Sequence, residues 1–207
     1  MKKLLLAVVM MVFCFAPVLH AAVITDIYYL TVNNAGLTGG PWATITLSQD
    51  TANLNRVDFV VDPTNTAFDG VGTNFGIQVF AFNENVSGSL NIFLPSAWSA
   101  TYGSNVSEFG TFAIKTSGTG STRQDPLSFY ITSAGNISLA NFEVGNSLGY
   151  FFVGHIAGFT VDGSDITSAW FASTGTNETP VPEPGTMMLL GSGLVGLAAW
   201  GRKKFRK

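Results

Sequence analysis

Few side chains of this sequence are suited to acid–base or nucleophilic chemistry, and His155 is the first to consider. It lies in the apolar run Phe-Phe-Val-Gly-His-Ile at residues 151–156 and is the single histidine between residues 22 and 180. A histidine in such a run is most often a structural residue whose ring bonds to backbone or carboxylate groups. The same range has no cysteine. It therefore offers no thiol nucleophile and no zinc site of histidine and cysteine ligands.

Carboxylates offer two further kinds of site. Asp62, Asp69, Asp162 and Asp165 lie in or beside expected turns, where carboxylates and backbone carbonyls can bind Ca²⁺. None of them has the regular Asp-x-Asp-x-Asp-Gly spacing, which favours ordinary solvated turn residues. A glycosidase needs two carboxylates about 5–10 Å apart, and nothing in the sequence selects such a pair from the twelve acids at residues 22–180. We therefore expect no catalytic residue, no metal and no cofactor.

Three tryptophans are candidates for contact with a glycan, because flat aromatic rings pack against the faces of sugars. They are Trp42, Trp98 and Trp170. Trp42 follows a proline and Trp98 precedes a serine, which places both in expected loops or strand ends. The alternative is core packing, since aromatic side chains dominate the interior of many β-sandwiches.

The body that must position these side chains is rich in expected strands. Residues 43–47, 57–61, 75–82 and 127–131 alternate apolar and polar side chains, which is typical of half-buried strands. Further candidate strands are residues 23–32, 90–94, 111–117, 150–156 and 168–173. Turn-forming clusters separate them, as at 33–36, 69–70, 117–118 and 162–163. Eight to ten short strands predict an all-β fold, a β-sandwich of jelly-roll type over residues 22–174.

The charge of this body excludes one class of partner. Residues 22–180 contain three Lys and Arg side chains against twelve Asp and Glu, although the whole chain has a net charge of only −3. Such an acidic body repels phosphate backbones, so we expect no binding to nucleic acid.

The first 21 residues are typical of an export signal. Lys2 and Lys3 precede an apolar run at residues 4–15, and Ala21-Ala22 offers a cleavage site. Cleavage after Ala21 would remove Cys14, the single cysteine, and leave a body without disulfides. The alternative is an uncleaved membrane anchor, for which the apolar run is short.

The C-terminal end has the composition of a membrane span. Residues 186–201 form an uncharged run of 16 residues, which as a helix would reach roughly 24 Å of a bilayer core of about 30 Å. A basic tail of cytoplasmic stop-transfer residues follows: Arg202, Lys203, Lys204, Arg206 and Lys207. The positive-inside rule keeps this tail in the cytoplasm and the body outside. Residues 175–180 predict a flexible stalk between the body and the span.

Pro182, Glu183 and Pro184 stand just before this run, and the two prolines keep the segment extended. The whole of residues 181–207 resembles a PEP-CTERM sorting signal, in which Pro-Glu-Pro, a glycine-rich apolar helix and a basic tail follow in this order. The resemblance implies export across the inner membrane of a Gram-negative bacterium that makes exopolysaccharide. It also implies that an exosortase, a membrane-embedded cysteine transpeptidase, recognises Pro182, Glu183 and Pro184 and removes the helix. A permanent anchor is the alternative.

These observations favour a non-enzymatic protein of the cell surface or extracellular matrix, associated with exopolysaccharide in a biofilm. The expected partners are an exosortase, the membrane through a transient C-terminal helix, and exopolysaccharide. A carbohydrate-binding module that acts through exposed tryptophans is the first alternative. A secreted glycoside hydrolase is the second.

Overall fold

The structure is a computed structural model of the 207-residue chain and describes residues 22–161 and 167–175. Its strands are β1 (Val23–Leu30), β2 (Val32–Asn33), β3 (Ala43–Asp50), β4 (Arg56–Pro63), β5 (Gly70–Phe82), β6 (Leu90–Phe93), β7 (Ser99–Asn105), β8 (Thr111–Ser117), β9 (Leu127–Ser133), β10 (Phe152–Thr160) and β11 (Ser168–Ser173). Three short 3₁₀ turns complete the described elements: η1 (Asn65–Ala67), η2 (Ser107–Phe109) and η3 (Leu139–Asn141). The expected all-β class is confirmed.

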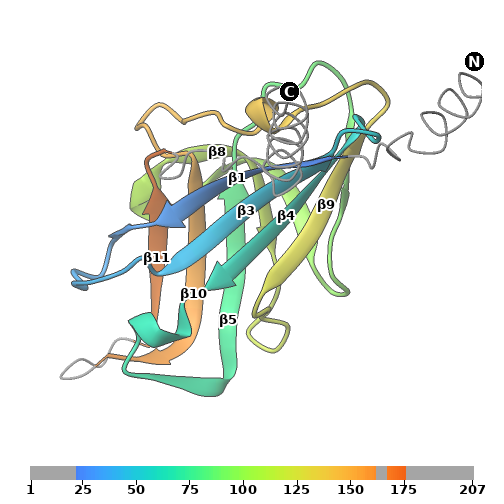
Figure 1. Cartoon of the computed structure of the whole chain (residues 1–207). Coiled ribbons are helices and arrows are strands. Elements are labelled where there is room, and N and C mark those ends of the chain that lie inside the picture. Colours follow the sequence, from blue (N-terminus) through green and yellow to red (C-terminus); the bar gives the residue numbers. More distant parts are fainter. Residues whose placement is uncertain (1–21, 162–166, 176–207) are drawn as a thin grey trace, which may run out of the picture.

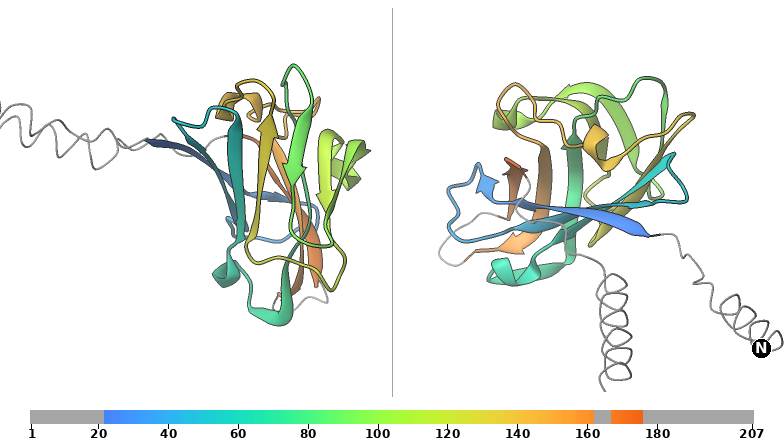
Figure 2. Two further views of the ribbon diagram at one scale, coloured as in Figure 1. Left: turned by 90° about the vertical axis from the view of Figure 1, so that its right-hand side faces the viewer. Right: turned by 45° about the horizontal axis from the view of Figure 1, so that its top comes forward.

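The strands form two antiparallel sheets that pack face to face as a sandwich (Figures 1 and 2). Sheet 1 has the order β1-β3-β4-β9-β6, and sheet 2 has the order β2-β11-β10-β5-β8-β7. The pairings are nested, because β7 pairs with β8, β6 pairs with β9 and β5 pairs with β10. This central part of the chain is thus a long hairpin whose arms are distributed over both sheets.

The alternation in the sequence decides which face of each strand is buried. In β3, Ala43, Ile45 and Leu47 are buried, while the threonines between them are half-exposed. The register places Ile45 opposite Val61 and Leu47 opposite Phe59, so the apolar faces of β3 and β4 coincide. A shift by one residue would turn the whole apolar set towards solvent, which fixes this register strongly.

Aromatic rings fill the space between the sheets. Phe59 of sheet 1 contacts Phe82 of sheet 2 at 5.2 Å between ring centroids. It also stacks on Phe129 at 4.7 Å and meets Phe142 edge-on at 5.3 Å. A protein without disulfides in this region must be held together by such burial, because aromatic side chains remove large apolar areas from water.

The outer face of sheet 2 has a second, smaller apolar cluster. Ala81, Val153 and Ala172 point away from the central core and are fully buried there by Val106 and Phe109. β10 is therefore buried on both faces over part of its length, which explains the nearly continuous apolar run Phe-Phe-Val-Gly-His-Ile.

Some strands differ from the expected ones. β7 was not expected, since Ser-Ala-Thr-Tyr-Gly-Ser-Asn has no apolar alternation; it is an exposed edge strand that needs none. The single strand expected at residues 23–32 is divided, with β1 in sheet 1 and β2 in sheet 2. β10 continues to Thr160, beyond the expected end at residue 156, with irregular pairing to β5 after His155.

Gly76 allows a close approach of two chain segments at one of these irregular places. Its φ is +141°, and a Cβ atom there would lie 2.4 Å from the carbonyl oxygen of Gln124. The neighbouring Ile77 exchanges backbone hydrogen bonds with Gln124 at 2.8 and 3.0 Å. Only glycine fits this backbone, which fastens the loop before β9 to the side of β5.

Candidate functional site

The expected sorting residues Pro182, Glu183 and Pro184 lie outside the described residues. The same holds for the export signal at residues 1–21, the apolar run 186–201 and the basic tail 202–207. Within residues 22–161 and 167–175, no helix is long and apolar enough to cross a membrane. The geometry of a site can thus be described only for the sandwich.

Two of the three tryptophans expected at a glycan surface belong to the core. Trp42 is 1% exposed, and its ring lies 5.3 Å from the rings of both Phe68 and Phe171. Trp98 is 8% exposed, and its indole N–H donates to the carbonyl of Thr122 at 2.7 Å. The expected glycan contact is therefore wrong for both residues, because neighbouring side chains and backbone cover their rings.

Trp170 lies on the outer face of sheet 2 and is half-buried. It stands directly opposite His155 in the pairing of β10 with β11, and the two rings are 4.8 Å apart between centroids. Asn34 fixes the backbone of Trp170, since it accepts a hydrogen bond from the Trp170 amide at 3.1 Å and donates one to the Trp170 carbonyl at 3.2 Å. The structure thus brings together two of the residues that the sequence singled out.

A β-bulge adds a polar side chain beside this pair. His155 pairs with Val79 and Ile156 pairs with Ile77, so Gln78 is the extra residue of β5. Its side-chain oxygen accepts a hydrogen bond from Nε of Arg123 at 3.3 Å. Bulges commonly redirect a side chain in this way next to functional sites.

Arg123 is held in place by the loop before β9. Its Nη1 donates to the carbonyl of Asn74 at 2.9 Å. The adjacent residues are fixed too, because Thr122 accepts the indole hydrogen bond of Trp98 and Gln124 pairs with Ile77. In the part of the chain that the structure describes, the ion pair observed is Arg56 with Asp58, so Arg123 carries its charge without a carboxylate partner there.

The electrostatics of His155 follow from this setting. Burial lowers the pKa of His155 below its usual value of 6.5, and the positive charge of Arg123 lowers it further. The imidazole is therefore neutral at pH 7 and offers one donor and one acceptor nitrogen. We call Trp170, His155, Gln78 and Arg123 the His155 group; it can present a ring face together with hydrogen-bonding groups to a sugar.

Sequence reasoning missed Gln78 and Arg123. Both residues depend on a bulge and on a loop that folds back on β5, and neither leaves a periodic trace in the sequence. The one signal was compositional, since Arg123 is one of three cations at residues 22–180.

Two of the four acidic residues considered for a Ca²⁺ site, Asp62 and Asp69, lie in the described part of the chain. Among the described residues, no three His, Cys, Asp or Glu side chains lie close enough to share a metal ion. Asp62 lies within β4 and Asp69 directly precedes β5, while Asp162 and Asp165 lie outside the described residues.

Asp26 of β1 and Glu143 lie close together, and Asp62 lies close enough to Asp125 to raise its pKa. Burial raises the pKa of Glu143, and the nearby Asp26 raises it further. The pair sits beside Tyr28, whose ring is packed between Phe151 and Phe152 in the core. Tyr28 is fully buried, so this pair is built into the margin of the core.

Comparison with known proteins identifies the C-terminal segment. A family profile described as PEP-CTERM protein-sorting motif matches residues 180–203. The match includes Pro182, Glu183 and Pro184 together with the apolar run and the first two basic residues, which confirms the resemblance seen in the sequence. No curated protein and no solved structure matches the chain. The chain therefore carries a PEP-CTERM protein-sorting motif behind its β-sandwich, and it is an exported protein sorted by an exosortase.

Proposed function

We propose that this protein is a non-enzymatic component of the cell surface or extracellular matrix of a Gram-negative bacterium. An exosortase removes its tail, and the sandwich then associates with exopolysaccharide. The observation that carries this proposal is the order of the parts, in which the sorting motif at residues 180–203 follows a sandwich with its own core.

The tail is suited to a short stay in the membrane. A helix over residues 186–201 would be slightly short for a bilayer core, while the five cations behind it oppose translocation. Prolines on both sides of Glu183 keep the chain extended just outside the membrane, where a processing enzyme can bind it. The carboxylate of Glu183 is then the charged group that the exosortase can recognise, and a cationic group of the enzyme would pair with it.

The sandwich is suited to binding rather than to catalysis. The nested pairing of β5 to β10 supports a jelly-roll-like description, an architecture that lectin domains also use. The His155 group offers the ring of Trp170 and the hydrogen-bonding groups of His155 and Arg123.

The charge at Glu183 tests the sorting proposal. In the native host, Glu183→Gln keeps the size and shape of the side chain but removes its charge, so we expect the full-length, membrane-bound form to accumulate. Glu178→Gln is the matched control, because it removes a carboxylate five residues upstream, outside the matched segment. Intact mass of the protein from cells and from medium distinguishes the forms. An intact tail on the wild-type protein in its own host would overturn the proposal in favour of a permanent anchor.

A further inference from the structure

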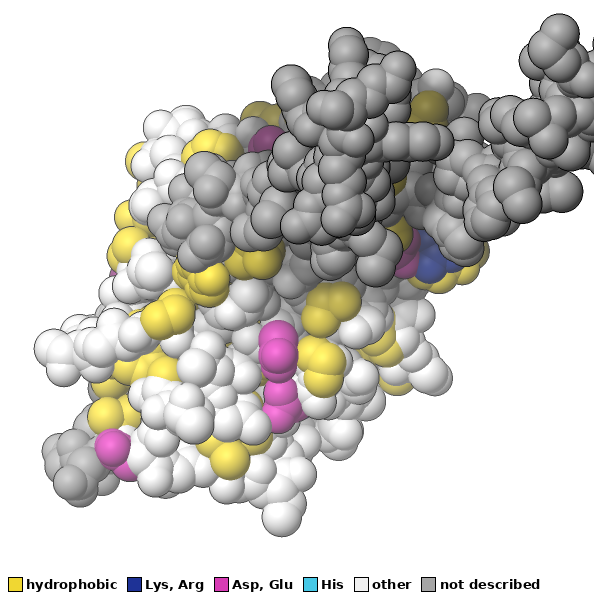
Figure 3. Space-filling model, in the orientation of Figure 1, with side chains coloured by type: hydrophobic (Ala, Val, Ile, Leu, Met, Phe, Trp, Pro, Cys, Tyr) yellow, Lys and Arg dark blue, Asp and Glu magenta, His cyan; other side chains and the backbone are white. Residues whose placement is uncertain are grey.

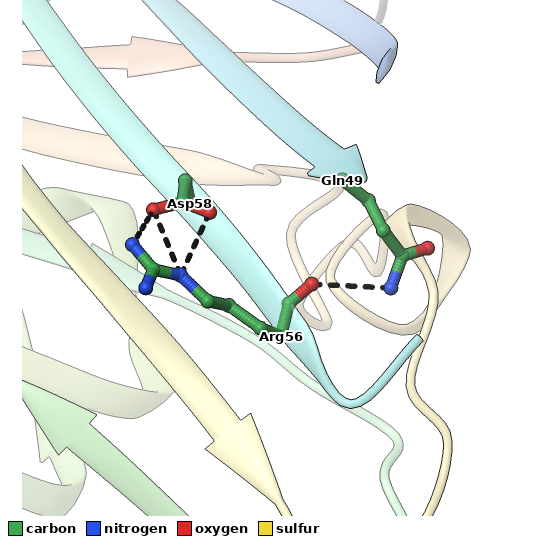
Figure 4. A network of polar contacts seen from close by, with 3 residues as sticks. All are labelled: Gln49, Arg56 and Asp58. Atoms are coloured by element: carbon green, nitrogen blue, oxygen red, sulfur yellow. Dashed lines mark hydrogen bonds and ion pairs between the residues drawn. The ribbon is translucent and has the colours of Figure 1, made fainter. Parts of the chain in front are cut away.

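The outer face of sheet 1 carries a row of side chains that the proposed function does not use. Tyr130 of β9 is paired with Asp58 of β4 on one side and with Phe93 of β6 on the other. Arg56 precedes Asp58 by two residues on the same strand, and Figure 4 shows its guanidinium turned back onto the carboxylate. We call Arg56, Asp58, Tyr130 and Phe93 the Tyr130 row.

The aromatic members of this row form a stack with one open end. The rings of Phe93 and Tyr130 are 4.5 Å apart between centroids and inclined by only 12°. Cζ of Arg56 lies over the Tyr130 ring, 3.8 Å from its centroid. Arg56 and Phe93 cannot share one face of the ring at these distances, so they cover its two faces. Phe93 is 47% exposed, and its outer face is the open face of the stack.

Arg56 and Asp58 neutralise one another. Nε of Arg56 donates to both carboxylate oxygens of Asp58, at 3.1 and 3.0 Å, and Nη2 forms an ion pair with Oδ1. The buried side chain of Gln49 fixes the base of this arrangement, because it donates to the Arg56 carbonyl at 3.1 Å (Figure 4). The pair is partly exposed, so its free lone pairs and N–H groups can still meet hydroxyl groups.

Two depressions of the surface meet at this pair. One, of about 420 Å³, runs past Val60 and Ser128 to Phe93 and Pro95. The other, of about 220 Å³, is lined by Asp50, Asn53, Arg56 and Asp58. Together they form a shallow, continuous path across the outer face of sheet 1, with Arg56 and Asp58 in its middle.

We infer that this path binds a neutral polysaccharide, with one sugar ring stacked on Phe93 and its neighbours hydrogen-bonded to Arg56 and Asp58. An anionic chain is disfavoured, since the one cation of the path is already paired and Asp50 adds negative charge. A protein partner is disfavoured too, because hydrophobic side chains are scattered over the uncovered part of this face and do not form one continuous patch (Figure 3). The inference rests on the proposed association with exopolysaccharide, and it adds a second site on the opposite sheet from the His155 group and names its ligand class.

Affinity electrophoresis of the full chain in mild detergent tests this site, with hydroxyethylcellulose as the neutral probe and alginate as the anionic one. We expect Phe93→Ala to weaken binding to hydroxyethylcellulose roughly tenfold or more, as removal of a central aromatic contact does at other interfaces. Phe93→Tyr keeps a ring in the same place and should bind like the wild type. Tyr102→Ala is the matched control, because Tyr102 is an aromatic residue of sheet 2 that is 64% exposed.

The outcomes separate this inference from the proposed function. Equal binding of the wild type and Phe93→Ala, with both folded by circular dichroism, overturns the site but leaves the association intact. Binding of the wild type to alginate alone overturns the neutral class of ligand. A wild type that binds neither probe nor the exopolysaccharide of its own host overturns both. Loss of binding in Phe93→Ala with retention in Phe93→Tyr and Tyr102→Ala establishes the site.

Discussion

Phe59 tests whether the aromatic core holds the sandwich together. The side chain is fully buried and packs against the rings of Phe82, Phe129 and Phe142, so it joins both sheets to the segment before β10. Truncation of a core phenylalanine to alanine costs about 3–5 kcal/mol. Because Phe59→Ala leaves all three neighbouring rings facing a cavity, we expect a cost near the middle of this range, about 4 kcal/mol. That is a large part of the roughly 5–15 kcal/mol that stabilises a typical domain.

Thermal unfolding of the full chain in mild detergent, followed by circular dichroism, measures this cost. A loss of about 4 kcal/mol corresponds to a fall in Tm of roughly 8–16 °C for a domain of this size. Phe93→Ala is the comparison, because Phe93 is half-exposed and has one cross-strand ring partner, which is worth about 1 kcal/mol or less. Equal falls in Tm for the two variants would refute the reasoning that burial between the sheets carries the stability.

Three further outcomes follow from the described contacts. The pKa of Glu143 is higher in the folded state than in the unfolded state, so the folded state binds the proton more tightly. Protonated Glu143 therefore adds to the free energy of unfolding below pH 4.5, and this contribution is lost as pH rises through the raised pKa of the folded state. Glu143→Gln should therefore raise Tm at pH 7 and flatten this part of the pH profile. The His155 imidazole should titrate below 6.5 by NMR, and its contribution to stability should be lost as pH falls through that lowered pKa. Gly76→Ala should lower Tm more than Gly36→Ala, because both have positive φ but only Gly76 meets backbone atoms within 4 Å.

The central strands and the C-terminal motif were predictable because each is a local pattern. In β3, β4 and β9 one face is buried and the other is not, so a period of two residues marks them directly. The sorting motif needs no tertiary structure to be recognised, since its three parts follow one another in the chain.

The groups of side chains that meet on the surfaces of the sandwich were not predictable, because they depend on the register between paired strands. Arg56, Phe93 and Tyr130 are distant in the sequence and become neighbours only through the pairing of β4, β9 and β6. Trp42 and Trp98 each stand next to a turn-forming residue, yet the loops that carry them fold inwards over the core. A tryptophan beside a proline can lie in either position, and the sequence contains no local signal that separates the two.

The distribution of charge links the sorting motif to the kind of binding that we propose for the sandwich. In the proposed topology, the basic residues of the tail would attract the unprocessed chain to the anionic lipids of the inner leaflet. Cleavage near Glu183 would remove them and leave a body with three cations against twelve or thirteen acids, which anionic surfaces repel. Retention in a matrix must then rest on contacts that do not need positive charge. The Tyr130 row meets this condition, because its arginine is neutralised and its open surface is a phenylalanine ring. We therefore expect binding of the processed protein to its matrix to change little between low and high salt.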